Sequence, residues 1–293
     1  MSRASVKVKE MRRGHPEDSR IPQAARVPHS QLRTMVTRRY AGYSEATHSF
    51  GCPVVLHATT AVQIVIGVGD TVFHPRSFLR GPKDAPLLLN IARDSSYLEL
   101  WLNPLGAYSL LDTDGGADYR GRIIDFGDVA GPCGRNLSDK IRDESTWSAR
   151  FDILEEFLLG RAERGRDVLP GVGKAWALLI NSGGMMPIAR IAEAVGWSHK
   201  HLITKFTQQI GLSPKTAARI IRFDRARHLL RKRPHSPLHE VAADCGYADH
   251  SHLDRDFRAF SGFTPSEYIV HFRNQSKDRC ESPALKGNKA RLS

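Results

Sequence analysis

The stretch IARIAEAVGWSHKHLITKFTQQIGLSP (188–214) is followed by a second version of itself, LHEVAADCGYADHSHLDRDFRAFSGFTP (238–265). The matching positions keep an offset of 50 residues, which becomes 51 after one inserted residue. The residues of the first copy that recur in this way are Ile188, Ile191, Ala192, Val195, Gly196, Leu202, Phe206, Gly211 and Pro214. This many matches at fixed spacing predict two copies of one structural unit.

Each copy predicts two helices joined by a tight turn. Its first four apolar residues have the spacing i, i+3, i+4 and i+7, which forms one stripe along a helix. The glycine that follows, Gly196 or Gly246, can take a positive φ and end that helix. A second helix then begins, capped by Ser198 in one copy and Asp249 in the other. Helix, glycine turn and second helix is the helix-turn-helix pattern.

The second helix of each copy has a narrow apolar seam, which predicts that its opposite side faces outward. The seam consists of Leu202 and Phe206 in the first copy and of Leu253 and Phe257 in the second. At 100° per residue, the side chains pointing away from the seam are Lys200, Ile203, Thr204, Thr207, Ser251, Asp254, Arg255 and Arg258. Such side chains can contact base edges and phosphates, so we expect a convex DNA-binding surface.

The run GYADHSHLDRDF (246–257) is crowded with polar groups and could also be considered as a chemical site. His250 and His252 are two residues apart, and a helix turns such side chains well away from each other, which disfavours a metal site. Nothing in the pattern predicts a pocket that would shift the pKa of Asp254 or Asp256. We expect Asp256 to form a salt bridge on a solvated face.

A long helix is predicted between the two copies. Ser213 is its expected cap and Pro214 its first residue. A buried stripe is expected from Ile220, Phe223, Ala226 and Leu230, and arginines occupy much of the remaining surface. About 17 helical residues span roughly 25 Å, so the two reading helices can lie about one duplex turn, roughly 34 Å, apart. This geometry predicts binding in two successive major grooves.

Composition and the pattern of apolar residues divide the rest of the chain into segments. The 43 Lys and Arg against 31 Asp and Glu give a net charge of +12, which favours a polyanionic partner. The chain is expected to have an α+β two-domain fold, with a mostly antiparallel β domain followed by an all-α domain. The expected segments are a flexible basic arm (1–40), a β-rich sensor domain (41–147), a linker helix (148–169) capped by Ser148, a DNA-binding domain (170–273) and a disordered tail (274–293).

Several other classes of protein are disfavoured. No apolar run approaches the roughly 18 residues that cross a bilayer, and residues 1–40 lack the pattern of a signal peptide, so a cytoplasmic protein without a membrane partner is expected. Four cysteines without a C-x-x-C pair argue against a structural zinc module and a disulfide framework. We expect no catalytic residues, no metal and no cofactor.

Residues 170–272 resemble the DNA-binding domain of AraC/XylS transcriptional regulators. The resemblance rests on both units, on the intervening SPKTAARIIRFDRARHLL and on GYADHSHLDRDFRAFSGFTPSEY (246–268). It implies base reading by Lys200, Ile203, Thr204, His250, Ser251, Asp254 and Arg255. Contacts to the DNA backbone are expected from Ser198, Lys205, Thr207, Arg219, Arg222 and Arg258. The expected function is a sequence-specific transcriptional regulator that binds double-stranded DNA, with RNA polymerase, a small effector or a second copy as additional partners.

The N-terminal half leaves alternatives open. FLRGP (78–82) and ELWLNPLGAYSLL (99–111) are similar to parts of the sensor domains attached to such regulators. Trp101 and Tyr108 are candidates for lining an effector pocket, with core packing as the alternative. An enzyme of the Ada type, transferring alkyl groups to Cys133 in the loop GPCGRN, is a second hypothesis. A nonspecific DNA binder is the third.

Overall fold

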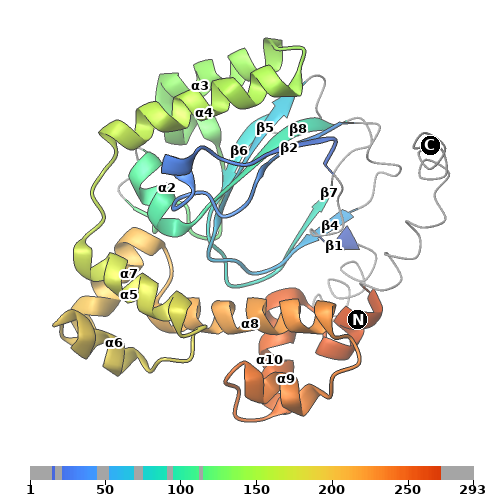
Figure 1. Cartoon of the computed structure of the whole chain (residues 1–293), viewed down its shortest axis with the longest axis vertical. Coiled ribbons are helices and arrows are strands. Elements are labelled where there is room, and N and C mark those ends of the chain that lie inside the picture. Colours follow the sequence, from blue (N-terminus) through green and yellow to red (C-terminus); the bar gives the residue numbers. More distant parts are fainter. Residues whose placement is uncertain are drawn as a thin grey trace, which may run out of the picture.

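The computed structural model describes residues 15–16, 22–44, 53–68, 75–90, 95–111 and 115–271. It has an N-terminal part built around β-strands and a C-terminal part made of helices, stacked along the long axis of the molecule (Figure 1). This confirms the α+β two-domain fold class expected from the sequence. In the N-terminal part the strands are β1 (His15–Pro16), β2 (Ala24–Arg26), β3 (Tyr40–Tyr43), β4 (Pro53–Leu56), β5 (Val62–Val68), β6 (Ser77–Arg80), β7 (Leu87–Asn90), β8 (Ser96–Leu102) and β9 (Ile123–Asp125).

The larger sheet has six strands in the order β2-β3-β8-β5-β6-β9, and every pairing in it is antiparallel. Its centre is the long pair β5 and β8, in which Ile64 lies opposite Leu100. A smaller sheet has the order β1-β4-β7. All seven residues of β5 are buried, which is typical of a strand that is covered on both faces.

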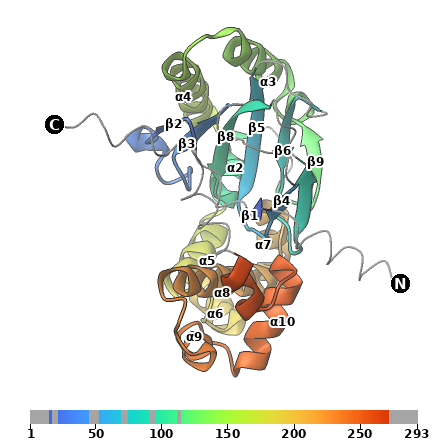
Figure 2. The same ribbon diagram turned by 90° about the vertical axis from the view of Figure 1, so that its right-hand side faces the viewer.

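Helices cover one face of the larger sheet, and the smaller sheet lies on the other side. The helices of this part are α2 (Pro104–Leu110), α3 (Phe126–Asp143) and α4 (Trp147–Arg164), with a short 3₁₀ helix, η2 (Ser30–Leu32). Leu98 and Leu100 of β8 form one core with Leu137 of α3 and Leu154 of α4. Tyr97, which points to the opposite face, packs with Leu56 of the smaller sheet. Figure 2 shows the strands of the larger sheet side by side, from β2 to β9, with α3 and α4 above them.

Three boundaries predicted for this part were wrong. Residues 22–40 were expected to be a flexible arm, yet Leu32 and Tyr40 are fully buried in the main core. The run GRIIDFGDV (121–129) is rich in β-prone residues and predicts a strand, whereas only Ile123–Asp125 form β9 and α3 begins at Phe126 because Asp125 caps it. The cap of α4 is Thr146, whose Oγ1 accepts from the backbone of Ala149, and not Ser148. The expected tail, 274–293, lies outside the described residues.

The C-terminal part consists of α5 (Pro170–Asn181), α6 (Ile188–Val195), α7 (His199–Ile210), α8 (Pro214–Lys232), α9 (Leu238–Asp244), α10 (His250–Ser261) and a last helix over 265–271. Each repeated unit has its own core. In the first unit, Ile191 of α6 packs with Leu202 and Phe206 of α7. In the second, Val241 of α9 packs with Leu253 and Phe257 of α10.

The long helix α8 connects the two cores. Ser213 caps it by accepting from the backbone of Thr216 at 3.1 Å, and Pro214 is its first residue, as predicted. Its 19 residues correspond to about 28 Å. The predicted stripe of Ile220, Phe223, Ala226 and Leu230 is buried.

The two parts of the chain are in direct contact. The backbone of Ala58, which follows β4, donates to the carbonyl of Phe260 in α10 at 2.8 Å. The buried His57 ring packs edge-on against Phe223 at 6.2 Å between centroids. At a second point, the backbone of Gly116 donates to the carbonyl of Gln209 at the end of α7. The N-terminal part is therefore connected to both repeated units.

Candidate nucleic-acid interface

The first unit presents the amino-terminal half of α7 to solvent. Gly196 has φ 72° and ends α6, as predicted, and Ser198 caps α7 by accepting from the backbone of His201 at 3.2 Å. Lys200, Ile203 and Thr204 are exposed in the intact chain, Ile203 to 37%. An exposed isoleucine suits contact with a thymine methyl group.

The second unit repeats this arrangement with α10. Gly246 has φ 71° and makes the turn, and Asp249 accepts from the backbone of His252 at 2.7 Å. His250, Ser251 and Arg255 are exposed, while Asp254 is half-buried. The carboxylate of Asp249 is thus used as a helix cap, as expected.

The two candidate reading helices lie on the same side of the domain. Figure 2 shows α7 and α10 to the right of α8, with α5 and α6 to the left. The second helices of both copies therefore lie on one side of the connecting helix. A rigid duplex running along that side can meet both helices, which is the requirement for reading two successive grooves.

Asp256 differs from its predicted role. It does form a salt bridge, but it is only 1% exposed instead of lying on a solvated face. Arg219 of α8 donates to Asp256 Oδ1 through Nη2 at 2.6 Å and through Nε at 3.2 Å. The guanidinium of Arg219 also lies over the Phe260 ring, 5.0 Å from its centroid. This buried pair fixes α10 against α8.

Arg222 makes a second connection between α8 and the second unit. It donates to the carbonyl of Gly246 at 3.2 Å and lies over the ring of Tyr247. Burial, reinforced by the nearby Asp256, raises the pKa of Tyr247 well above its ordinary value. Of the expected backbone-contacting residues, Arg219 and Arg222 therefore have partners within the protein.

The remaining residues of that set differ in accessibility. Ser198 and Arg258 are exposed, and Lys205 and Thr207 are half-buried. The surface of α8 is strongly basic, with seven Lys or Arg and one acidic residue among 19. The exposed members of this set are Lys215, Arg225, Arg231 and Lys232. Exposed cations attract the phosphate backbone of nucleic acids.

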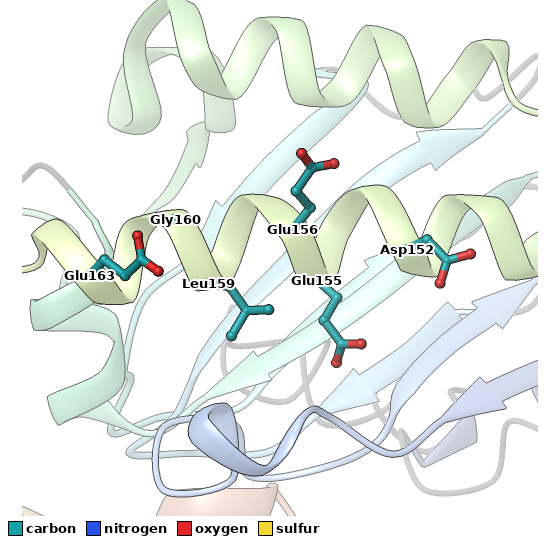
Figure 3. A pocket seen from close by; sticks show the side chains of 6 residues that line it. All are labelled: Asp152, Glu155, Glu156, Leu159, Gly160 and Glu163. Atoms are coloured by element: carbon teal, nitrogen blue, oxygen red, sulfur yellow. The ribbon is translucent and has the colours of Figure 1, made fainter.

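An acidic hollow lies on α4, at a distance from this basic surface. Figure 3 shows Asp152, Glu155, Glu156 and Glu163 around Leu159 on one helix. Some of this charge is bound internally, since Arg26 pairs with Asp152 and the backbone of His29 donates to Glu155 at 2.6 Å. Carboxylates repel phosphates, so this face disfavours nucleic acid.

The groups considered for catalysis or metal binding are not brought together. Cys133 was expected in a loop, but it is an exposed residue of α3, beyond a kink at Gly131. Figure 1 shows α3 at the end of the molecule far from α10. Cys245 is buried, and burial raises its pKa to about 11, which disfavours the reactive thiolate. Within the described ranges, no group of three or more His, Cys, Asp and Glu side chains could hold a metal ion.

Trp101 and Tyr108 occupy different environments. Trp101 is 3% exposed and donates to Glu99, while the guanidinium groups of Arg38 and Arg80 lie against its ring. Tyr108 is half-buried on α2, the helix that packs against α7. Neither residue lines the acidic hollow on α4 or the hollow between α8 and α10. In the part of the chain that is described, no helix has the length and apolar character needed to cross a bilayer.

Comparisons with known proteins concern mainly the C-terminal part. A family model described as a helix-turn-helix domain matches residues 191–270. The transcriptional activator RhaS of Escherichia fergusonii is 36% identical over 85 residues, covering 26% of this chain and 30% of RhaS. The transcriptional regulator MtrA of Neisseria gonorrhoeae is 32% identical over 127 residues, covering 40% of this chain and 42% of MtrA. The match thus spans less than half the length of these curated relatives.

Among solved structures, the comparison finds ToxT from Vibrio cholerae, which has a TM-score of 0.43 at 12% identity and covers 79% of this chain and 97% of that one. An AraC-type DNA-binding domain-containing regulator from Chromobacterium violaceum has a TM-score of 0.33 at 25% identity and covers 35% of this chain and 92% of that one. Residues 191–270 of this chain thus match a helix-turn-helix family, and the C-terminal region is similar in sequence to parts of the transcriptional regulators RhaS and MtrA.

Proposed function

We propose that this chain is a sequence-specific DNA-binding regulator of transcription that reads two successive major grooves with α7 and α10. The observation that carries the proposal is that both second helices leave most of their outward residues exposed in the intact chain, and that both helices lie on one side of α8. The residues proposed to read bases are Lys200, Ile203 and Thr204 in α7 and His250, Ser251, Asp254 and Arg255 in α10.

Contacts to the DNA backbone are proposed for Ser198, Lys205, Thr207 and Arg258. Arg219 and Arg222 are also predicted to contact the DNA backbone. We propose that they position α10 as well, because Arg219 connects α8 to α10 and Arg222 connects α8 to the turn before α10. Accurate positioning matters because base reading requires the second helix to enter its groove at a fixed depth.

We propose further that the N-terminal part regulates DNA binding through its contacts with the two units. A small effector or a second copy that bound the N-terminal part would act by stabilising or releasing the hydrogen bonds from Ala58 to Phe260 and from Gly116 to Gln209. RNA polymerase is the partner expected if the regulator activates transcription. A cytoplasmic location is proposed, as DNA access in a bacterial-type regulator requires.

Selection of bound duplexes from a random pool tests the main proposal. The selected sequences should contain two boxes about 10 base pairs apart, centre to centre. Equal affinity for a selected duplex and for its scrambled version, measured at the same salt concentration, would contradict sequence-specific binding.

A further inference from the structure

A basic groove lies between the two helix-turn-helix units. We define it by Lys215, Arg219 and Arg222 of α8 and by His252, Arg255 and Asp256 of α10, with the loop before α6 forming its opposite wall. It is a hollow of about 470 Å³. Because its walls come from both units, any duplex that meets α7 and α10 together must pass near it.

The charge of the basic groove is only partly neutralised by the protein. Arg219 is paired with the buried Asp256. In the described part of the chain, Lys215 and Arg255 have no hydrogen-bond or salt-bridge partner, and both are exposed. The groove therefore retains positive charge that solvent ions or an anionic partner must neutralise.

The walls of the basic groove are held together before any partner arrives. Met185, in the loop before α6, packs so closely on the turn of the second unit that a Cβ at Gly246 would lie 2.6 Å from its Cγ. Arg222 donates to the carbonyl of the same glycine. The two units thus have a fixed relative position, and the free cations are arranged in advance.

We propose that the basic groove binds the DNA phosphates that lie between the two boxes. Between two successive major grooves on one face of a duplex, the backbone crosses the surface that separates the two reading helices. Arg255 belongs both to the proposed reading surface of α10 and to the lining of the groove, so a backbone strand leaving α10 would enter the hollow that Lys215 also lines. Small-molecule sites are mostly apolar with a few polar groups, whereas this groove is dominated by charged side chains, which favours a polyanion.

The proposal deepens the proposed function and rests on it. Its first test uses the full-length chain with Lys215→Gln, a change at an exposed side chain. Affinity for the selected duplex and for a scrambled duplex should fall by the same factor. The slope of log affinity against log salt concentration should decrease by about 0.9, the contribution of one phosphate contact. Lys140→Gln, on α3, changes the net charge equally and should leave both quantities unchanged.

A second test removes the charge from the DNA instead. A duplex with one neutral methylphosphonate midway between the boxes should bind the wild-type chain several-fold more weakly. The Lys215→Gln variant should bind the modified and the unmodified duplex with equal affinity, because its contact with this phosphate is already absent. If Lys215→Gln keeps the wild-type salt slope, or if the two losses simply add, the groove does not bind these phosphates. Failure of the proposed function would look different, because the wild-type chain would then not distinguish selected from scrambled DNA.

Discussion

The buried pair of Arg219 and Asp256 offers the sharpest test of how α10 is held in place. Replacing Asp256 with Ala leaves the guanidinium of Arg219 without its carboxylate. Breaking a buried pair by removing one partner costs about 3 to 5 kcal/mol. Asp256 is 1% exposed, but the side chain of Arg219 is 37% exposed, so water can partly solvate the remaining charge. We therefore expect a cost of about 3 kcal/mol, at the lower end of that range.

Amide hydrogen exchange of α10 measures this cost where it arises. A loss of about 3 kcal/mol in the free energy of local opening corresponds to roughly a hundredfold faster exchange. Peptides from α3 and α4 should keep their wild-type rates. Asp254→Ala removes a carboxylate from the same helix, but one that forms no ion pair in the described part of the chain. This control should change the exchange of α10 by less than a few-fold.

A double substitution separates the lost pairing from a simple packing defect. Arg219→Met with Asp256→Leu removes both charges and retains side-chain volume, and such replacements are often neutral. The backbone amides of α10 in the double variant should therefore exchange at close to the wild-type rate. If the amides of α10 in Asp256→Ala exchanged within threefold of the wild-type rate, or if those of the double variant exchanged as fast as those of the single variant, the pair would not hold α10 in place.

Three further outcomes are expected. Arg255→Ala should weaken binding to a selected duplex by about 1 to 3 kcal/mol and relax the preference at one base pair; an equal loss on scrambled DNA in a mobility-shift titration would assign Arg255 to the backbone only. Gly116→Ala should loosen the contact between the N-terminal part and α7, because the added Cβ would lie 2.4 Å from the carbonyl carbon of Ile210. Faster amide hydrogen exchange at the end of α7 would support this prediction, and unchanged exchange would contradict it. Cys133 should be alkylated in the native chain and Cys245 only in denaturant. The reason is that Cys133 is exposed, whereas Cys245 is buried and its thiol has a raised pKa. Peptide mapping that found alkylation of Cys245 in the native chain would contradict the structure.

The sequence predicted the C-terminal part well because its signals are local. Caps at Ser198, Ser213 and Asp249 act within three residues of themselves, and glycine turns need no distant partner. The apolar stripes repeat at helical spacing in both copies. Most of the residues that these features predict to point outward from α7 and α10 are exposed, whereas Thr207 and Asp254 are half-buried.

The burial of Asp256 was missed although a signal was present. Leu253, Asp256, Phe257 and Phe260 have the spacing i, i+3, i+4 and i+7, so the aspartate lies in the buried stripe. Its partner, Arg219, is 37 residues earlier in the chain. A pattern within one helix cannot identify such a partner, and the carboxylate was therefore expected on the surface.

The N-terminal part was predicted less accurately for a related reason. A short apolar run such as IIDFGDV is compatible with a strand or with the start of a helix, and the cap at Asp125 decides between them. Residues 22–40 appeared unstructured because only a few of them, including Leu32, Val36 and Tyr40, reach the core. The contact of His57 with the second unit depends on how the two parts pack, which no local pattern encodes.

The spacing of the two boxes tests the central claim most directly. If α7 and α10 are held by α8 in successive major grooves, inserting five base pairs between the boxes turns one of them by about half a helical turn. Only one unit could then bind, and affinity should fall at least tenfold, whereas the same insertion outside the boxes should have no effect. Unchanged affinity after the insertion between the boxes would contradict simultaneous reading by the two helices.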